Sequence, residues 1–371
     1  MFVPLVGKLL IPLLTLGLFR SDIMRNRIGF SLLIVAVLLT QRGLAGTITV
    51  TSLADSGPGS LRQAVTSAAA GDTIDFSVNG TIMLTSGELA ISTNLIVTGP
   101  GAGSLAVERS TAPGTPDFRI FRMASGTVIT VSGLTISNGR AADGGGIRNE
   151  GTLALLTCVI SGNLATNAGG GINNLSTLTM SNCVVAGNGT ATLPAGAGLG
   201  GGLNNGVAGT LTLIRSTINS NSVAGGAAGG FGGGINNDGG TLILTNSVVN
   251  ANSVTGGAGA GTAGGGIFNG GTVTVDTTTI GSNSAIGGAG NTGGTGQGGG
   301  LANVSGTVTI NRSTVSGNVA SGGSGTAGAG GTGEGGGIAS DVDMYVSDST
   351  VSGNVTVSGI GASSARGTCS G

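Results

Sequence analysis

A short unit that occurs seven times constrains the fold of this chain more than any other feature. Each copy opens with three glycines and an aliphatic residue, continues as a threonine-rich stretch, and closes with asparagine. The copy from Gly264 to Asn283 reads GGGIFNGGTVTVDTTTIGSN. The last glycines of the seven triplets are Gly146, Gly171, Gly202, Gly234, Gly266, Gly300 and Gly337. The closing asparagines are Asn163, Asn188, Asn221, Asn252, Asn283, Asn318 and Asn354.

The spacing divides each copy into a near-constant part and an elastic part. From the last glycine to the closing asparagine the copies span 17 to 19 residues, whereas the spacers that follow range from 8 to 19 residues. A repeat of this size indicates a solenoid, because each unit can bury its apolar face only against its neighbours. We therefore expect seven regular repeats in residues 144–371.

The unit has the pattern of β-strands. Glycine is too frequent for helix interiors, and the apolar residues alternate, with Leu211 and Leu213 pointing inward and Thr212 outward. Each unit offers three short strands: one after the glycines, the threonine-rich one, and one before the closing asparagine. The sequence thus predicts an all-β, right-handed, single-stranded parallel β-helix with three short strands per rung and rungs about 4.8 Å apart.

Two columns of asparagine follow from such stacking. The closing asparagines are expected at a bend, where asparagine tolerates unusual backbone angles, with each amide bonded to the next rung. The second column follows the glycines and is interrupted by Ser340; its members are Asn149, Asn174, Asn205, Asn237, Asn269 and Asn303. A binding stripe is the alternative, but the bends of a stacked coil need such residues, so we predict structural ladders.

The GGGI-x-N and [IV]-x-x-N pair resembles the repeats of polymorphic outer-membrane proteins, whose motifs read GGA[ILV] and FxxN. The stretch from Gly59 to Val65, GSLRQAV, is similar to the CSLREA-type domain at the start of many bacterial β-helix surface proteins, with Gly59 in place of Cys and Gln63 in place of Glu. The resemblance implies a pectin-lyase-like β-helix on the outside of a bacterium. It does not decide the activity, because that fold carries enzymes and adhesins alike.

Residues 46–143 are interpreted as an N-terminal cap and irregular first rungs. A helix is predicted from Ser60 to Ala70, because Ser60 and Gln63 form a capping box and Gly71 is a suitable stop. Leu61 and Ala64 share one face of that amphipathic helix. We expect it to cover the open end of the coil, which would otherwise expose apolar side chains and unpaired backbone.

Residues 1–45 are interpreted as an export signal. After Met24, which we take as the true start, come the basic Arg25 and Arg27, an apolar run from Ile28 to Leu39, and small residues up to a cleavage site near Ala45. A membrane anchor is the alternative, but a span needs roughly 18 apolar residues. The predicted product is extracellular or on the outer membrane or cell surface, and its mature chain does not span the membrane.

Cleavage after residue 45 removes five basic residues and one acidic residue, so the net charge falls from −1 to −5. A chain of that charge lacks the basic surface that nucleic acids require. Only 8% of the residues are charged, yet 39% are hydrophobic and regularly patterned, which argues against disorder.

An active site is hard to find in this composition. Histidine is absent, and between Gly151 and Gly333 the only charged residues are Asp238, Asp276, Arg215 and Arg312. The lyases and hydrolases that share the resemblance imply clustered acids, with a basic proton acceptor in the lyases. The acidic residues that could form such a groove are Asp75, Glu88, Glu108, Asp117, Asp143 and Glu150.

Metal and thiol chemistry have few candidates. Asp341 and Asp343 alternate, so they are expected to share a strand face and are the one weak calcium site; no other metal or cofactor is predicted. Cys158 and Cys183 occupy equivalent places on consecutive rungs. A disulfide between them and a pair of buried free thiols are equally compatible with that spacing.

These features predict a non-enzymatic, adhesin-like or structural protein that presents a stiff rod to an unknown surface ligand, such as a polysaccharide or a neighbouring cell. The alternative is a polysaccharide lyase or glycoside hydrolase with its groove in residues 72–150. The Gly-rich spacers are expected to leave one corner of the coil as a flexible fringe. For the C-terminal end of the coil we expect one of three alternatives. The sequence is a fragment of a longer chain, residues 355–371 form a makeshift cap, or a partner covers the open edge.

Overall fold

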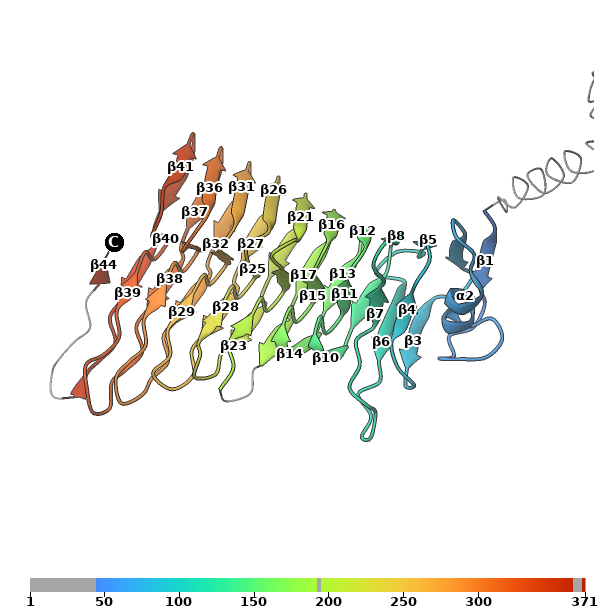
Figure 1. Cartoon of the computed structure of the whole chain (residues 1–371), viewed down its shortest axis with the longest axis horizontal. Coiled ribbons are helices and arrows are strands. Elements are labelled where there is room, and N and C mark those ends of the chain that lie inside the picture. Colours follow the sequence, from blue (N-terminus) through green and yellow to red (C-terminus); the bar gives the residue numbers. More distant parts are fainter. Residues whose placement is uncertain (1–44, 192–194, 363–368, 371) are drawn as a thin grey trace, which may run out of the picture. The chain divides into compact units, whose positions relative to one another are not determined.

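The structure, a computed structural model, describes residues 45–191, 195–362 and 369–370. Except for Ala45, the predicted export signal lies outside these residues. Residues Ala45–Gly371 form one compact unit. In its described part, short strands stack into four parallel sheets along one axis (Figure 1). The predicted parallel β-helix is confirmed.

From β7 onward, each turn passes through sheets C, A and B, which are the three predicted strands, and then through sheet D, whereas the earlier turns have no strand in sheet D. Sheet C contains β4 (Leu89–Ile91), β7 (Phe121–Met123), β11 (Ile147–Asn149), β15 (Ile172–Asn174), β20 (Leu203–Asn205), β25 (Ile235–Asn237), β30 (Ile267–Asn269), β35 (Leu301–Asn303) and β40 (Ile338–Ser340). Sheet A contains β1 (Thr47–Val50), β2 (Thr73–Phe76), β5 (Leu95–Thr98), β8 (Val128–Ser132), β12 (Thr152–Leu156), β16 (Thr177–Ser181), β21 (Thr210–Ile214), β26 (Thr241–Thr245), β31 (Thr272–Asp276), β36 (Thr307–Asn311) and β41 (Met344–Ser347).

Sheet B contains β3 (Gly80–Leu84), β6 (Leu105–Arg109), β9 (Thr135–Ser137), β13 (Val159–Ser161), β17 (Val184–Ala186), β22 (Thr217–Asn219), β27 (Val248–Asn250), β32 (Thr279–Gly281), β37 (Thr314–Ser316) and β42 (Thr350–Ser352). Sheet D contains β10 (Arg140–Asp143), β14 (Leu164–Ala168), β18 (Gly189–Ala191), β19 (Gly198–Leu199), β23 (Ser222–Ala224), β24 (Gly230–Phe231), β28 (Ser253–Thr255), β29 (Thr262–Ala263), β33 (Ser284–Ile286), β34 (Gly296–Gln297), β38 (Val319–Ser321), β39 (Gly333–Glu334), β43 (Val355–Val357) and β44 (Cys369–Ser370).

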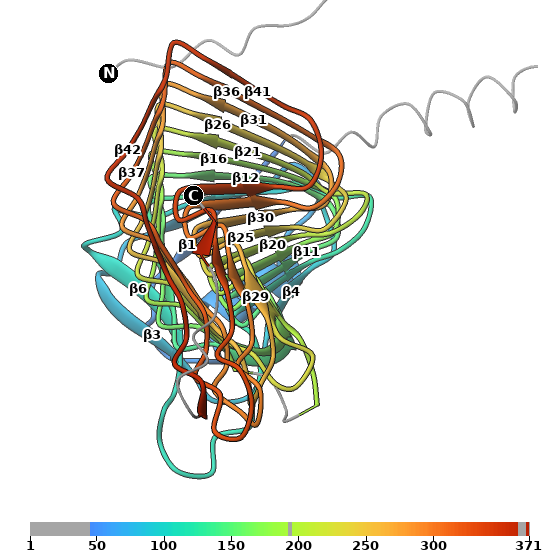
Figure 2. The same ribbon diagram turned by 90° about the vertical axis from the view of Figure 1, so that its left-hand side faces the viewer.

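The strands of successive turns lie behind one another along the axis of the coil (Figure 2). A continuous column of mostly aliphatic side chains forms the core inside them. Leu211 pairs with Leu178 on one side and Leu242 on the other, and all three are fully buried. Thr212, between two buried leucines, lies on the half-buried outer face, as the alternation predicts. Each rung therefore repeats the burial pattern of its neighbours.

The Gly-rich spacers do not form the expected flexible fringe, because their ends are strands of sheet D. From the spacer after Asn188 onward, both ends of each spacer are short strands that pair with the equivalent ends on the next rung: Ser284 pairs with Val319, and Gly296 pairs with Gly333. Glycine makes this possible, because a Cβ atom at Gly296 would overlap the backbone of Ser321. The spacers thus join the hydrogen-bonded coil instead of hanging from it.

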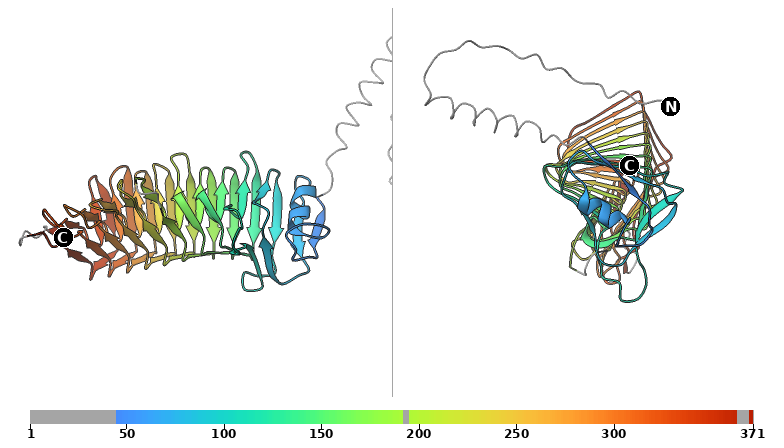
Figure 3. Two further views of the ribbon diagram at one scale, coloured as in Figure 1. Left: turned by 90° about the horizontal axis from the view of Figure 1, so that it is seen from below. Right: turned by 90° about the vertical axis from the view of Figure 1, so that its right-hand side faces the viewer.

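Helix α2 (Leu61–Ser67) lies beside β1 and β4 at the N-terminal end of the coil (Figure 3). The first half of the predicted capping box is present, because the Gln63 N–H donates to Ser60 Oγ at 3.2 Å. The return bond differs: Gln63 Oε1 accepts from the N–H of Gly59 at 2.7 Å, one residue before the N-cap Ser60. Leu61 is fully buried in the core. The described part of the chain has no helix long and apolar enough to span a membrane.

The residue before each closing asparagine has a left-handed backbone conformation. Three of these residues are not glycine: Ser220 has a φ of 53°, Ala251 53° and Ser282 52°. This corrects the expectation that the closing asparagine itself takes the unusual backbone angles. A side chain makes that conformation costly, by roughly 1–2 kcal/mol.

Replacing Ala251 with glycine is therefore expected to raise the free energy of unfolding by about 0.5–1 kcal/mol, since the relief of strain exceeds the extra entropy of the unfolded glycine. Denaturant unfolding of the purified variant measures this change. The matched control is Ala186→Gly in β17, which has no such strain and is expected to lose about 0.5–1 kcal/mol. A loss of stability in Ala251→Gly would contradict the account.

Candidate functional site

Charged side chains gather on the first irregular rungs, where sheet C meets sheet D. In β7 and β11 the alternation buries Phe121 and Ile147 and turns Arg122 and Arg148 outward. The two arginines are register partners on adjacent rungs. Such like charges need a carboxylate between them, and Glu150 provides it, 2.9 Å from Arg122 Nη2 and 2.8 Å from Arg148 Nε.

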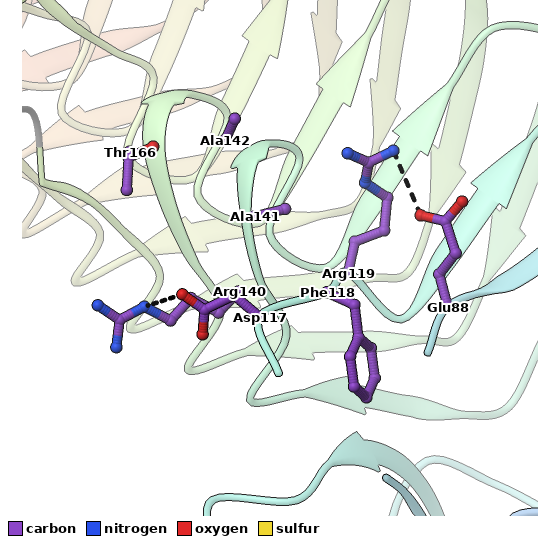
Figure 4. Close-up of a pocket in the computed structure, with 8 residues that line it drawn as sticks. All are labelled: Glu88, Asp117, Phe118, Arg119, Arg140, Ala141, Ala142 and Thr166. Atoms are coloured by element: carbon purple, nitrogen blue, oxygen red, sulfur yellow. Dashed lines mark ion pairs between the residues drawn. The ribbon is translucent and has the colours of Figure 1, made fainter. Parts of the chain in front are cut away.

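A pocket of about 350 Å³ lies beside these rungs, and we call it the arginine pocket. Two ion pairs line it, with Ala141 between them (Figure 4). Arg119 Nη1 is 3.4 Å from Glu88 Oε2, and Arg140 Nε is 3.3 Å from Asp117 Oδ2. The remaining lining residues are Phe118, Ala142 and Thr166. The pocket thus combines fixed donors, fixed acceptors and an apolar part.

Arg119 is the least satisfied of the charged residues in the arginine pocket. Its side chain is 16% exposed, and its buried Nε has no hydrogen-bond partner in the described chain. Burial lowers the pKa of its guanidinium below the ordinary value, Glu88 opposes that shift, and the nearby Arg148 and Arg122 add to it. The positive charge of Arg119 is therefore only partly compensated.

The six acidic residues proposed for a groove do not form one. Glu88, Asp117, Asp143 and Glu150 each pair with an arginine near the arginine pocket, Asp143 to Arg148 at 3.6 Å. The other two lie on different sheets: Asp75 belongs to β2, and Glu108, on β6, accepts from Ser137 and Asn138. The groove expected to be acidic is instead a charge-balanced cluster.

Arginine contacts also hold Glu150 in its ionised form. Burial of Glu150 opposes ionisation, but hydrogen bonds from Arg122 and Arg148 outweigh it and lower the pKa of this carboxyl below its ordinary value. The arginines were the signal that the sequence interpretation overlooked. Arg109, Arg119, Arg122, Arg140 and Arg148 fall within 40 residues of a chain that has only 14 basic residues.

The closing asparagines form a buried ladder through the coil. Asn252 Oδ1 accepts from the backbone N–H of Asn221 at 3.0 Å and from its Nδ2 at 2.9 Å. The same pair of bonds links every successive member: Asn163, Asn188, Asn221, Asn252, Asn283, Asn318 and Asn354. The side-chain amides of this ladder already hydrogen-bond one another and the backbone. They are therefore not available as a row of ligand-binding groups.

The second asparagine column is bonded in the same way. Asn149 Nδ2 donates to Asn174 Oδ1 at 2.7 Å, and the bonds continue rung by rung until Asn303 donates to Ser340 Oγ at 3.0 Å. A third, shorter column was missed: Asn236 donates to Asn204, and Asn204 to Asn173. The repeated dipeptide Asn-Asn after the triple glycine was its signal.

Cys158 and Cys183 lie side by side on adjacent rungs as buried free thiols. The Cys158 N–H contacts Cys183 Sγ at 3.4 Å, in the place where the next rung uses Ser216 Oγ. The interaction with Cys183, followed by burial, raises the pKa of the Cys158 thiol. Of the two alternatives left open by the spacing, the structure has the free thiols.

Asp341 and Asp343 are exposed in the bend between β40 and β41 and do not share a strand face as expected. The strand begins only at Met344, after both aspartates. Across the described residues, no group of three or more histidine, cysteine, aspartate or glutamate side chains is arranged to hold a metal ion.

Searches of family models and of curated proteins give no match. Among solved structures, the pectate lyase Pel9A is 12% identical over 84% of this chain and 80% of its own, with a TM-score of 0.42. An alginate lyase from Paenibacillus sp. str. FPU-7 is 12% identical, covering 82% of this chain and 99% of its own, with a TM-score of 0.40. The A-module of the Azotobacter vinelandii mannuronan C-5 epimerase AlgE6 is 14% identical over 82% and 97%, with a TM-score of 0.38. Likeness at this level assigns neither an activity nor site residues.

Proposed function

We propose that this chain is an exported, non-enzymatic β-helix that binds an acidic polysaccharide in the arginine pocket. The observation that carries the proposal is the half-satisfied guanidinium of Arg119, whose buried Nε has no partner in the described chain. A buried donor without an acceptor costs about 1–3 kcal/mol. A ligand oxygen placed there would recover that free energy.

An acidic sugar matches the rest of the arginine pocket. Its carboxylate suits the planar donors of Arg119 and Arg140, which bind carboxylates through paired N–H groups. Its hydroxyl groups both donate and accept, and Glu88 and Asp117 offer acceptors at the same pocket. Ala141 and Ala142 supply apolar contact for the ring.

Binding without cleavage is favoured by the state of the carboxylates. Acid catalysis of glycoside cleavage needs a carboxyl that keeps its proton near neutral pH. Here the four acids of the cluster are paired with arginines, and the pKa of Glu150 is lowered. A long coil with uniform faces and one charged cluster near its first rungs then acts as a stiff support that presents this pocket.

Elimination is the second candidate, and one observation favours it. Burial and the neighbouring arginines lower the pKa of Arg119, so the neutral guanidine that could accept a proton costs less free energy here than in an exposed arginine. In that reaction the neutral guanidine form of Arg119 would take the proton next to the carboxylate of a uronate and become the guanidinium. The electron pair forms a carbon–carbon double bond as the glycosidic oxygen leaves, so the product is an unsaturated sugar.

Calorimetric titration with an oligogalacturonate tests the binding proposal. Arg119→Gln is expected to weaken binding at least tenfold, because a charge-assisted hydrogen bond contributes about 1.5–3 kcal/mol. The matched control is Arg312→Gln, which removes an exposed arginine that pairs with Asp276 far from the pocket and is expected to bind like the unmodified protein. Equal affinity in both variants would contradict the proposal.

A further inference from the structure

A second pocket of about 240 Å³ lies on sheet D among the regular repeats. Phe231, Ala263 and Gln297 line it from three successive rungs and are register partners in β24, β29 and β34. On three successive rungs this column therefore presents an aromatic ring, the small methyl side chain of an alanine, and an amide. We call this site the Phe231 pocket.

The aromatic side of the Phe231 pocket is not part of the core. The rings of Phe231 and Phe268 stand 4.9 Å apart at a tilt of 54°, and both side chains are only half-buried. Neither belongs to the hydrophobic core inside the coil. These are the only phenylalanines in residues 144–371. Packing inside the coil therefore does not explain them.

An unsatisfied hydroxyl group completes the Phe231 pocket. Thr262 is 3% exposed and lines the pocket, yet its Oγ1 has no partner among the described residues. On the neighbouring column, Asn236 is 1% exposed, its Oδ1 also lacks a partner, and its register partner is Phe268. Buried polar atoms are nearly always paired, so the unpartnered hydroxyl of Thr262, which lines the pocket, points to a ligand with hydroxyl groups.

The charges near the Phe231 pocket select an uncharged ligand. No arginine or lysine lines it. At its polar end, Gln297 Nε2 donates to Glu334 Oε2 at 2.8 Å, and Glu334 has no ion pair in the described part of the chain. The Glu334 carboxylate next to Gln297 would repel an acidic sugar, whereas a neutral sugar meets the Gln297 amide and the Thr262 hydroxyl, which hydrogen-bond hydroxyl groups.

We propose that the Phe231 pocket binds a neutral sugar ring, with its apolar face on Phe231 and its hydroxyl groups on Thr262 and Gln297. An aromatic anchor beside a few placed polar groups is the usual composition of a small-molecule site. This inference goes beyond the acidic ligand proposed for the arginine pocket and does not depend on it.

The test uses the full chain, calorimetry, and neutral hexasaccharides of glucose, mannose, xylose and galactose. At least one is expected to bind. Phe231→Leu keeps an apolar side chain but removes the aromatic face, and is expected to weaken that binding at least tenfold. Thr262→Val removes only the unpartnered hydroxyl, so the melting temperature should hold or rise while affinity falls about threefold to tenfold.

The controls separate the two pockets. Leu199→Ala, in the same column one rung before Phe231, is expected to leave binding of the neutral sugar unchanged. Arg119→Gln should also leave it unchanged, and Phe231→Leu should keep the affinity for oligogalacturonate. No binding of any of the four hexasaccharides, or equal binding by Phe231→Leu, would overturn the inference while leaving the arginine pocket untouched.

Discussion

Replacing Gly265 with alanine is expected to lower the free energy of unfolding by at least about 3 kcal/mol, the upper range for an overpacked core. Gly265 is the middle glycine of its triplet. A Cβ atom there would overlap the carbonyl oxygen of Gly299 and the backbone of Ser284. Both obstacles are main chain of neighbouring turns, so no side-chain rotation relieves the overlap. The rungs themselves would have to separate.

The midpoint of denaturant unfolding after full equilibration measures this loss. Gly103→Ala is the matched control, because a Cβ atom at Gly103 would meet nothing within 4 Å. We expect that variant to change the free energy of unfolding by less than about 0.5 kcal/mol. Equal midpoints for the two variants would contradict the prediction that the backbone around Gly265 is too close to accept a Cβ atom.

Asn252→Ala is expected to cost about 3–5 kcal/mol, because several buried groups lose partners at once. The backbone N–H of Asn221 loses its acceptor, and the Ile218 carbonyl loses the donor Asn252 Nδ2 at 2.9 Å. Asn283 Oδ1 loses one of its two donors from this residue. Water cannot replace them inside the closed coil.

The control for Asn252→Ala lies on the same rung. Asn250 belongs to β27 and is half-buried on its outer face. Asn250→Ala is expected to change the free energy of unfolding by about 0.5 kcal/mol at most. If Asn252→Ala cost less than about 1 kcal/mol in the same denaturant series, the ladder would not hold the turns together.

The rungs were predictable because each repeat meets a copy of itself. A residue such as Asn221 recurs at a nearly fixed distance after the triple glycine, so its neighbours above and below are other asparagines. The same argument placed Leu211 in the core. No long-range information was needed beyond the period of the sequence.

Sheet D and the two pockets were not predictable in this way. The spacers vary from 8 to 19 residues, and glycine shows no inward or outward pattern, so their pairing leaves no trace in the sequence. The arginine pocket joins Glu88 to Arg119 and Asp117 to Arg140 across irregular rungs that lack the repeat. With no period to fix their register, those pairs are visible only in three dimensions.

Incubation of the purified protein with polygalacturonate tests the central claim most directly, when bound polymer, new reducing ends and unsaturated sugar are measured in one sample. We expect retention of the polymer by the unmodified protein, much weaker retention by Arg119→Gln, and no change in polymer length. Unsaturated ends that disappear in Arg119→Gln would contradict the non-enzymatic account and show that cleavage depends on Arg119. Absence of both retention and cleavage would refute the arginine pocket as the binding site for an acidic polysaccharide.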